Sequence, residues 1–257
     1  MKKATEYLFA AQAASLAYQD EAAAAVNPLL KDLDGQLRVY TDSAPTMTAH
    51  AYGWVKDRTF YLTFRGTQSR SDMLADAHIL RTYLFPEGDR SVLVHAGFLS
   101  YYKSMEEKIV ADIELCRSPI DVLHVMGHSL GGALATIAAV SLGSKFPELR
   151  VTCHTVGSPR VGNAGFVRAF ARLITDSMRI TNSDDPVTRF PISPFYTHVT
   201  GFICIDDKCI VTEATVDVSW WRRLLSLPFQ IDCKAPIADH SCSQYIERLT
   251  KLAAAEI

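Results

Sequence analysis

Long hydrophobic runs are missing from this sequence. No apolar stretch approaches the roughly 20 residues that a membrane-spanning helix needs, so we expect no transmembrane segment. An excess of positive charge is also missing, because 26 Lys and Arg side chains are balanced by 28 Asp and Glu side chains, for a net charge of −2. This balance gives the chain no attraction to nucleic acid, and we expect no nucleic-acid partner.

Cysteine is sparse, and none of the six cysteines has the spacing of a zinc site, so we expect no metal. Cys204 and Cys209 differ from the rest. A two-residue turn at 206–207 would place them opposite each other in a non-hydrogen-bonded pair, where a disulfide can form. Two reduced thiols in a hairpin are the alternative. Cys233 and Cys242 flank a loop and form a second candidate pair; disulfides would indicate an oxidising compartment.

The chain is long enough for one large α/β domain. Its 257 residues, 48% of them apolar, can bury a substantial core, and we predict a single domain over residues 1–257. Met1-Lys-Lys is compatible with a signal peptide, but Glu6 and Gln12 interrupt the apolar stretch that should follow. An amphipathic first helix is favoured instead, because apolar residues recur at helical spacing. We therefore expect a soluble protein with no clear signal peptide in this chain, and we favour secretion.

Short β-branched and aromatic runs alternate with helical segments along the chain. The predicted strands cover residues 36–40, 51–55, 59–64, 121–126, 150–156 and 177–181, a further unit starts at 92–98, and helices follow at 99–116, 133–140 and 245–255. This alternation predicts an α/β fold with a mainly parallel, doubly wound sheet. Active-site loops should then lie at the carboxyl ends of the strands.

The most informative segment is Gly127-His-Ser-Leu-Gly131, a G-x-S-x-G pentapeptide between a predicted strand and a predicted helix. A sharp strand-to-helix turn projects the serine Oγ away from the backbone, but it leaves little room for side chains two residues before and after the serine. Gly127 and Gly131 meet this requirement. We therefore predict that Ser129 is a nucleophile for acyl transfer; a chance match to the pattern is the alternative.

A serine nucleophile needs a base, and in the chain order of α/β-hydrolases the base follows the serine. Of the eight histidines, this order leaves His198 and His240. His240 lies in a loop before a predicted helix, whereas His198 lies in residues 196–200, which resemble the start of a strand. A catalytic imidazole must reach across the strand ends from a loop, so we favour His240.

The base needs an acid that orients it, and the acid should follow a strand. Asp184 and Asp185 both follow the predicted strand 177–181. Pro186 restricts the residue before it to an extended backbone, which fixes Asp185 more firmly than Asp184. We predict that Asp185 is the acid.

The developing oxyanion needs two hydrogen-bond donors. The residue after the nucleophile supplies one, which is the N–H of Leu130. The second should follow an earlier strand, and Thr67 comes directly after Phe64-Arg-Gly66. Gly66 permits a tight bend, and Thr67 offers both an N–H and a hydroxyl.

Taken together, these segments resemble the lipase class 3 family, the fungal-type triacylglycerol lipases. The matching pieces follow the order of the family and cover most of the chain: Phe64-Arg-Gly-Thr67, Val94-His-Ala-Gly-Phe98, Gly127-His-Ser-Leu-Gly-Gly132, Gly157-Ser-Pro159, Asn182 through Pro191, and Asp239-His240. The resemblance implies an α/β-hydrolase fold, a triad of Ser129, Asp185 and His240, oxyanion donors at Thr67 and Leu130, and no cofactor. The family also supports the disulfide between Cys204 and Cys209.

The resemblance also implies carboxylic ester substrates, with triacylglycerol or other glycerol esters first. A feruloyl or short-chain esterase and a phospholipase share the machinery and are the nearest rivals. A non-catalytic lipid-binding protein on a hydrolase fold is a rival of another class. We expect an ester or lipid substrate and no obligate protein partner.

Two segments are candidates for contact with a lipid interface. Residues 69–85 occupy the place of the family's lid, where Met73 and Leu74 could form the inner face of a lid or of a fixed helix docked on the core. Trp220 and Trp221 lie in a stretch with the composition of an interfacial helix. A helix packed over the edge of the sheet is the alternative.

Overall fold

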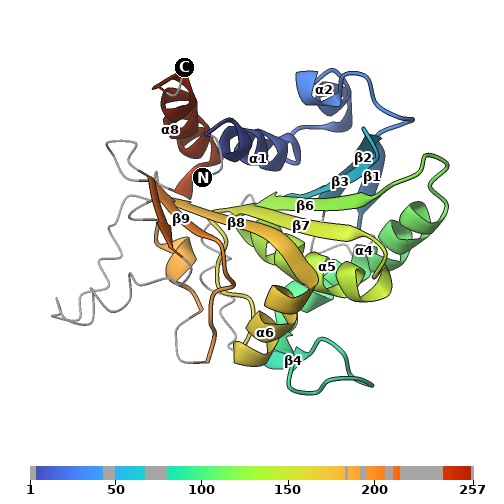
Figure 1. Cartoon of the computed structure of the whole chain (residues 1–257), viewed down its shortest axis with the longest axis vertical. Helices are drawn as coiled ribbons and strands as arrows, with labels where there is room; N and C mark the ends of the chain where they lie inside the picture. The colour runs from blue at the N-terminus through green and yellow to red at the C-terminus, as the bar shows by residue number, and fades with distance from the viewer. Residues whose placement is uncertain are drawn as a thin grey trace, which may run out of the picture.

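A computed structural model of the chain describes residues 4–42, 50–66, 80–182, 185–191, 195–205, 211–214 and 240–255. Within these residues an eight-stranded sheet has the order β1-β2-β3-β6-β7-β8-β9-β10 (Figure 1). Its strands are β1 (Arg38–Thr41), β2 (His50–Lys56), β3 (Thr59–Phe64), β6 (Val122–His128), β7 (Arg150–Val156), β8 (Ile174–Asn182), β9 (Phe202–Ile205) and β10 (Val211–Ala214).

The central strands of this sheet run parallel. β3, β6, β7, β8 and β9 pair in parallel, whereas β1, β2 and β10 add antiparallel pairs at the two edges. Parallel strands are buried on both faces and so need continuous apolar runs, which is the pattern of the predicted strands. The predicted mainly parallel sheet is confirmed.

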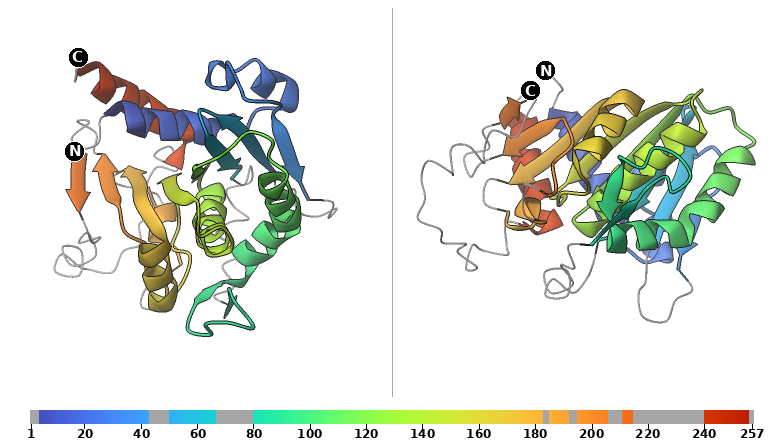
Figure 2. Two further views of the ribbon diagram at one scale, coloured as in Figure 1. Left: turned by 45° about the vertical axis from the view of Figure 1, so that its right-hand side comes forward. Right: turned by 90° about the horizontal axis from the view of Figure 1, so that it is seen from below.

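Helices cover both faces of the sheet. α4 (Ala96–Glu114), α5 (Leu130–Lys145) and α6 (Ala164–Leu173) lie on one face, and α1 (Ala4–Leu16) and α8 (Cys242–Ala255) lie on the other (Figures 1 and 2). The largest hydrophobic core fills the space between the sheet and α4, α5 and α6. None of the described helices is long and apolar enough to cross a membrane.

Short elements connect these layers. They are α2 (Glu21–Ala25), η1 (Pro28–Leu30), η2 (Val187–Arg189), and β4 (Arg81–Tyr83) paired antiparallel with β5 (Leu93–His95). β4 lies inside the stretch 69–85 that we considered as a lid. The last part of that stretch is therefore a strand, whereas residues 67–79 lie outside the described residues.

The first helix is confirmed, but its amphipathic character is wrong. α1 is buried on several sides, including Tyr7, Ala10 and Ala13. The cause is composition, since most of the buried residues are alanines, whereas Leu8 and Phe9 are only partly buried, so the two sides of the helix differ little in hydrophobicity. α8 lies beside α1 on the same face of the sheet and contacts it (Figure 1).

The predicted hairpin register around the cysteines is wrong. β9 and β10 pair with Ile205 opposite Val211 and Cys204 opposite Thr212. The connection therefore spans residues 206–210, so a two-residue turn at 206–207 does not form and does not place Cys204 opposite Cys209. Cys209 lies outside the described residues, and the disulfide stays a prediction.

The predicted start of a strand at residues 196–200 is also wrong. Only Thr197 takes part in pairing, through an isolated bridge to Gly162. Strand β9 begins later, at Phe202, directly after Gly201, whose φ of 86° turns the chain into the sheet.

Candidate active site

The pentapeptide forms a sharp turn between β6 and α5, with Ser129 at its apex. The backbone of Ser129 has φ 59° and ψ −129°, a conformation that costs an L-residue about 1–3 kcal/mol. The chain is so crowded here that a Cβ on Gly127 would lie 2.2 Å from the carbonyl oxygen of Gly131, and a Cβ on Gly131 would lie 2.1 Å from that of Phe64. Only glycine therefore fits at both positions.

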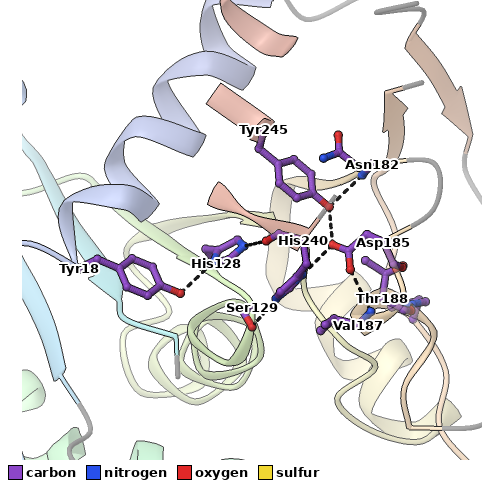
Figure 3. A network of polar contacts seen from close by, with 10 residues as sticks. Tyr18, His128, Ser129, Asn182, Asp185, Val187, Thr188, His240 and Tyr245 are labelled. Atoms are coloured by element: carbon purple, nitrogen blue, oxygen red, sulfur yellow. Dashed lines mark hydrogen bonds and ion pairs between the residues drawn. The ribbon is translucent and has the colours of Figure 1, made fainter. Parts of the chain in front are cut away.

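Ser129, His240 and Asp185 meet at the carboxyl end of the sheet (Figure 3). His240 Nε2 lies 2.7 Å from Ser129 Oγ, and His240 Nδ1 lies 2.8 Å from Asp185 Oδ2. A carboxylate only accepts, so Nδ1 carries the proton and Nε2 can accept the hydrogen of the serine hydroxyl. The three residues are buried, with exposed fractions of 4% for Ser129 and His240 and 1% for Asp185. This geometry can activate a nucleophile.

Asp185 accepts further hydrogen bonds that hold its carboxylate. Its Oδ1 accepts from the Val187 N–H at 2.9 Å, and its Oδ2 accepts from the Tyr245 hydroxyl at 2.7 Å. The Asn182 N–H in turn donates to the Tyr245 oxygen at 2.9 Å. Both carboxylate oxygens are thus occupied, which offsets the cost of burying the charge.

Tyr245 comes from the first turn of α8, five residues after His240 (Figure 3). Burial raises the pKa of its hydroxyl well above 10, and the neighbouring carboxylate of Asp185 raises it further. Tyr245 therefore remains a hydrogen-bond donor at neutral and mildly alkaline pH. No sequence pattern reveals the role of this residue, because only the packing of α8 against the end of β8 brings it to Asp185.

His128, the residue before the nucleophile, contacts His240 in two ways. Its ring stacks on the His240 ring with centroids 4.7 Å apart and an interplanar angle of 30°. Its Nε2 lies 2.8 Å from the backbone oxygen of His240, and its Nδ1 lies 2.8 Å from the Tyr18 hydroxyl (Figure 3). The sequence predicts neither contact, since nothing in a strand pattern reveals a partner 112 residues away.

The expected oxyanion donors are only partly described. Leu130 is the first residue of α5, and the first N–H groups of a helix have no partner within the helix. Thr67 lies outside the described residues. Gly66, directly before it, lies beside the nucleophile, because a Cβ on Gly66 would be 3.1 Å from the Cβ of Ser129. The strand end that leads to Thr67 therefore reaches the serine.

His198, the other histidine that the chain order allows, has a different environment. Its Nε2 donates to the backbone oxygen of Thr188 at 2.6 Å. Burial lowers the pKa of His198 well below 6.5, and the positive charges of Arg179 and Arg160 lower it further. His198 is therefore a buried, hydrogen-bonded histidine away from the serine, and it does not lie in a strand.

Several candidate residues lie outside the described residues. They are Met73, Leu74, Asp184, Cys209, Trp220, Trp221 and Cys233. The lid, the interfacial helix and the Cys204–Cys209 disulfide therefore stay predictions. The pairing of Cys242 with Cys233 is wrong, because Cys242 is a free thiol whose Sγ donates to the backbone oxygen of Ala11 at 3.7 Å. Among the residues that the structure describes, no group of three or more His, Cys, Asp or Glu side chains is arranged to hold a metal ion.

A second row of polar side chains, the His124–His154–Asp176 row, crosses β6, β7 and β8 on the side of their amino-terminal ends, with His154 the fifth residue of β7. His124 Nε2 lies 3.0 Å from His154 Nδ1, and His154 Nε2 lies 3.7 Å from Asp176 Oδ1. The row borders a cavity of about 410 Å³ beside α1. Among the described residues that line this cavity there is no serine.

Comparison with known proteins relates the chain to one protein family. The Lipase (class 3) family model matches residues 61–195. Secreted mono- and diacylglycerol lipase A of Penicillium cyclopium is 34% identical over 190 residues, which cover 70% of this chain and 59% of the relative. The chain thus spans about three-fifths of that relative's length.

Solved structures resemble the fold. The triacylglyceride lipase of Rhizomucor miehei superposes with a TM-score of 0.70 at 24% identity, covering 92% of this chain and 91% of that one. A triacylglycerol lipase described as having a serine protease triad at its catalytic centre gives a TM-score of 0.72 at 25% identity, with 92% of both chains covered.

Proposed function

Because the chain belongs to the class 3 lipase family, with its α/β-hydrolase fold, we propose that it is a serine carboxylic-ester hydrolase acting on acylglycerols. The observation that carries the proposal is the hydrogen-bonded chain from Ser129 Oγ through His240 to Asp185. The names of two similar proteins support the choice of substrate, since one is a mono- and diacylglycerol lipase and the other a triacylglycerol lipase.

Acylation begins with proton transfer from Ser129 to His240 Nε2. Ser129 Oγ attacks the ester carbonyl, and the carbonyl oxygen takes up the negative charge. The N–H of Leu130 and the donors of Thr67 stabilise that charge, and one such donor typically contributes about 3 kcal/mol. His240 then gives its proton to the leaving alcohol, so the base is regenerated and the acyl group remains on Ser129 as an ester.

Deacylation repeats the steps with water. His240 takes a proton from the water as it attacks the acyl carbon, and returns a proton to Ser129 Oγ when the carboxylic acid leaves. In both halves the imidazole is transiently positive. Asp185 stabilises that charge and fixes the tautomer, and its hydrogen bonds to Val187 and Tyr245 keep it in place.

The selectivity of the enzyme depends on segments that flank this machinery. We propose that the part of 69–85 before β4, including Met73 and Leu74, forms a lid, and that Trp220 and Trp221 dock on the lipid surface. Replacing both tryptophans should weaken activity on emulsions more than on dissolved short esters. Equal loss on both substrates would contradict docking.

Covalent labelling tests the proposal directly. An organophosphate should add one phosphoryl group to Ser129, identified by peptide mass spectrometry, and Ser129→Ala should abolish both labelling and ester hydrolysis. A folded wild-type protein that takes no label would instead indicate a lipid-binding protein on a hydrolase fold. Circular dichroism of the same sample separates this outcome from misfolding.

A chain-length series of nitrophenyl esters then separates the related activities. A lipase should prefer medium or long acyl chains and gain activity at an interface, whereas a short-chain or feruloyl esterase should prefer dissolved substrates. Release of a fatty acid from phospholipid vesicles would indicate a phospholipase. We also propose that the protein acts outside the cell, because the Penicillium relative is a secreted lipase.

A further inference from the structure

The contacts of His128 fix its protonation. The backbone oxygen of His240 can only accept, so the Nε2 of His128, 2.8 Å away, must carry a hydrogen. In the neutral ring Nδ1 is then an acceptor, and the Tyr18 hydroxyl at 2.8 Å donates to it. His128 is buried, with 5% exposed. One neutral tautomer therefore satisfies both contacts without a charge in the core.

The bond from His128 joins the nucleophile segment to the base segment through the main chain of the base. The other direct link, between Ser129 Oγ and His240 Nε2, cannot last through the reaction, because the serine hydroxyl becomes an ester in the acyl-enzyme. The bond to the His240 carbonyl involves no reacting atom and is unaffected by acylation. It can therefore hold His240 over the acyl carbon while water enters.

The ring contact adds an orientational restraint. With centroids 4.7 Å apart and an angle of 30°, the His128 ring covers one face of the His240 ring and opposes its rotation. The edge of Tyr245 lies over His128 from another side, with centroids 6.1 Å apart. When His240 becomes positive during catalysis, a neutral aromatic neighbour is favourable, whereas a charged one would repel it.

Resting on the proposed ester hydrolysis, we propose that His128 is a positioning residue that holds the base His240 through its carbonyl and its ring, and that Tyr18 fixes the tautomer in which it can do so. Tyr18 follows α1 and reaches the site from the start of the chain (Figure 3). Its hydroxyl also packs against the strand end before Thr67, since a Cβ on Gly66 would lie 2.2 Å from it. Tyr18 and His128 thus connect three segments of the site.

Three variants separate the hydrogen bonds from the ring contact. His128→Phe keeps an aromatic ring but removes both hydrogen bonds, and kcat on a dissolved short-chain nitrophenyl ester should fall by about 10- to 100-fold with KM within about twofold. Tyr18→Phe removes only the donor to Nδ1 and should lower kcat about fivefold. His128→Gln can donate to the carbonyl and accept from Tyr18, so it should recover kcat to within about fivefold of wild type.

Two matched controls remove similar groups that do not touch the base. His124→Phe removes a hydrogen-bonded histidine four residues earlier in β6, where it contacts His154 instead of the base. Tyr52→Phe removes a hydroxyl that donates to the backbone oxygen of Gln19 at 3.0 Å, beside Tyr18 in the chain. Both controls should keep kcat within about twofold of wild type, since neither touches His240.

A measurement without turnover supports the kinetics. In ¹⁵N spectra of the imidazoles, His128 should show a protonated Nε2 and an accepting Nδ1. The Nδ1 hydrogen of His240, bound to Asp185, should exchange with solvent faster in His128→Phe than in wild type. If wild type hydrolyses no ester and takes no organophosphate, the proposed function fails, and these spectra still decide whether His128 holds His240.

Two results would overturn the inference. One is a folded His128→Phe protein with wild-type kcat and wild-type exchange at His240. The other is a loss of kcat in His124→Phe as large as that in His128→Phe, which would indicate general damage to β6. If His128→Phe does not fold, His128→Gln and Tyr18→Phe decide the question, because wild-type kcat in Tyr18→Phe together with a full loss in His128→Gln would contradict the proposed hydrogen-bond chain.

Discussion

The two ends of the parallel strands carry similar side chains in different settings. At the amino-terminal end His154 lies 3.7 Å from Asp176, whose side chain is 36% exposed. At the carboxyl end His240 lies 2.8 Å from Asp185, whose side chain has no exposed surface. The buried carboxylate also accepts from Val187 and Tyr245. A histidine beside an aspartate is therefore not enough to define a site.

The two ends differ in the loops that the topology places beside them. Loops that follow β8 and precede α8 bring Asp185 and His240 to the carboxyl end, where the strained turn at Ser129 already lies. The other end is bordered by α1, which contributes Thr5, Glu6 and Phe9 to the cavity wall. Substitutions made in pairs, one at each end, test this comparison.

The largest contrast should come from the two aspartates. Asp185→Asn should lower kcat/KM by about 10⁴-fold, because the neutral amide cannot hold the His240 tautomer or stabilise its positive charge. Asp176→Asn should leave kcat/KM within about twofold. Steady-state kinetics on a dissolved nitrophenyl ester measures both. Comparable losses in the two variants would abolish the distinction between the ends.

Two glycines of α5 give the next contrast. Gly131→Ala forces a Cβ to within 2.1 Å of a backbone oxygen, and this should lower the free energy of unfolding by about 3 kcal/mol or more. Gly143→Ala, at the far end of the helix, meets Val151 Cγ2 at 3.3 Å. Its unfolding free energy should stay within about 1 kcal/mol of wild type, because alanine favours the helix. Urea unfolding measures both, and equal values would mean that the turn is not crowded.

A smaller contrast involves two tyrosines. Tyr245→Phe removes one donor from the Asp185 carboxylate and should lower kcat about tenfold, since hydrogen bonds to charged groups contribute about 1.5–3 kcal/mol. Tyr61 lines the cavity at the other end and stacks on His124, with ring centroids 5.5 Å apart. Tyr61→Phe should leave kcat unchanged. A kcat for Tyr245→Phe equal to that of wild type would show that Val187 alone suffices to hold the carboxylate.

The smallest effect extends the comparison to His198. Because its pKa is well below 6.5 in the folded protein, the unfolded state binds a proton that the folded state does not as pH falls below 6.5. The stability that neutral His198 confers should therefore be fully present well above pH 6.5 and should decrease as pH falls through 6.5, by about 1 kcal/mol between pH 6.5 and 5.5. In His198→Gln the decrease between pH 6.5 and 5.5 should be smaller by this amount, as measured by urea unfolding. Parallel curves would indicate that His198 is protonated in the fold.

Much of the candidate site was predictable because local chemistry dictates it. Glycines two residues on either side of Ser129 predict the crowded turn, and Pro186 favours Asp185 over Asp184 as the acid. The three side chains chosen on such grounds do lie within hydrogen-bond distance of one another. Local patterns also predicted the parallel strands, since a buried strand needs a continuous apolar run.

The rest depends on contacts between remote segments. Tyr245 meets Asp185 only when α8 docks, and His128 meets its partners only when Tyr18 and His240 pack beside it, so no spacing in the sequence reveals these contacts. The hydrophobic contrast expected on α1 is missing because its buried residues are mostly alanines, whereas Leu8 and Phe9 are only partly buried. The register at Cys204 was wrong because two aspartates fit a short turn as well as a five-residue connection, and pairing across the sheet decides between them.

The contact between α1 and α8 gives the molecule a property that its chemistry alone does not suggest. Tyr18 follows the first helix, and His240 precedes the last one, which packs against the first (Figure 1). Before these helices pack together, Ser129 therefore lacks the imidazole of His240. The triad can therefore form only after the two helices have met, so local unfolding of either helix would separate the serine from its base without disturbing the sharp turn that carries the serine.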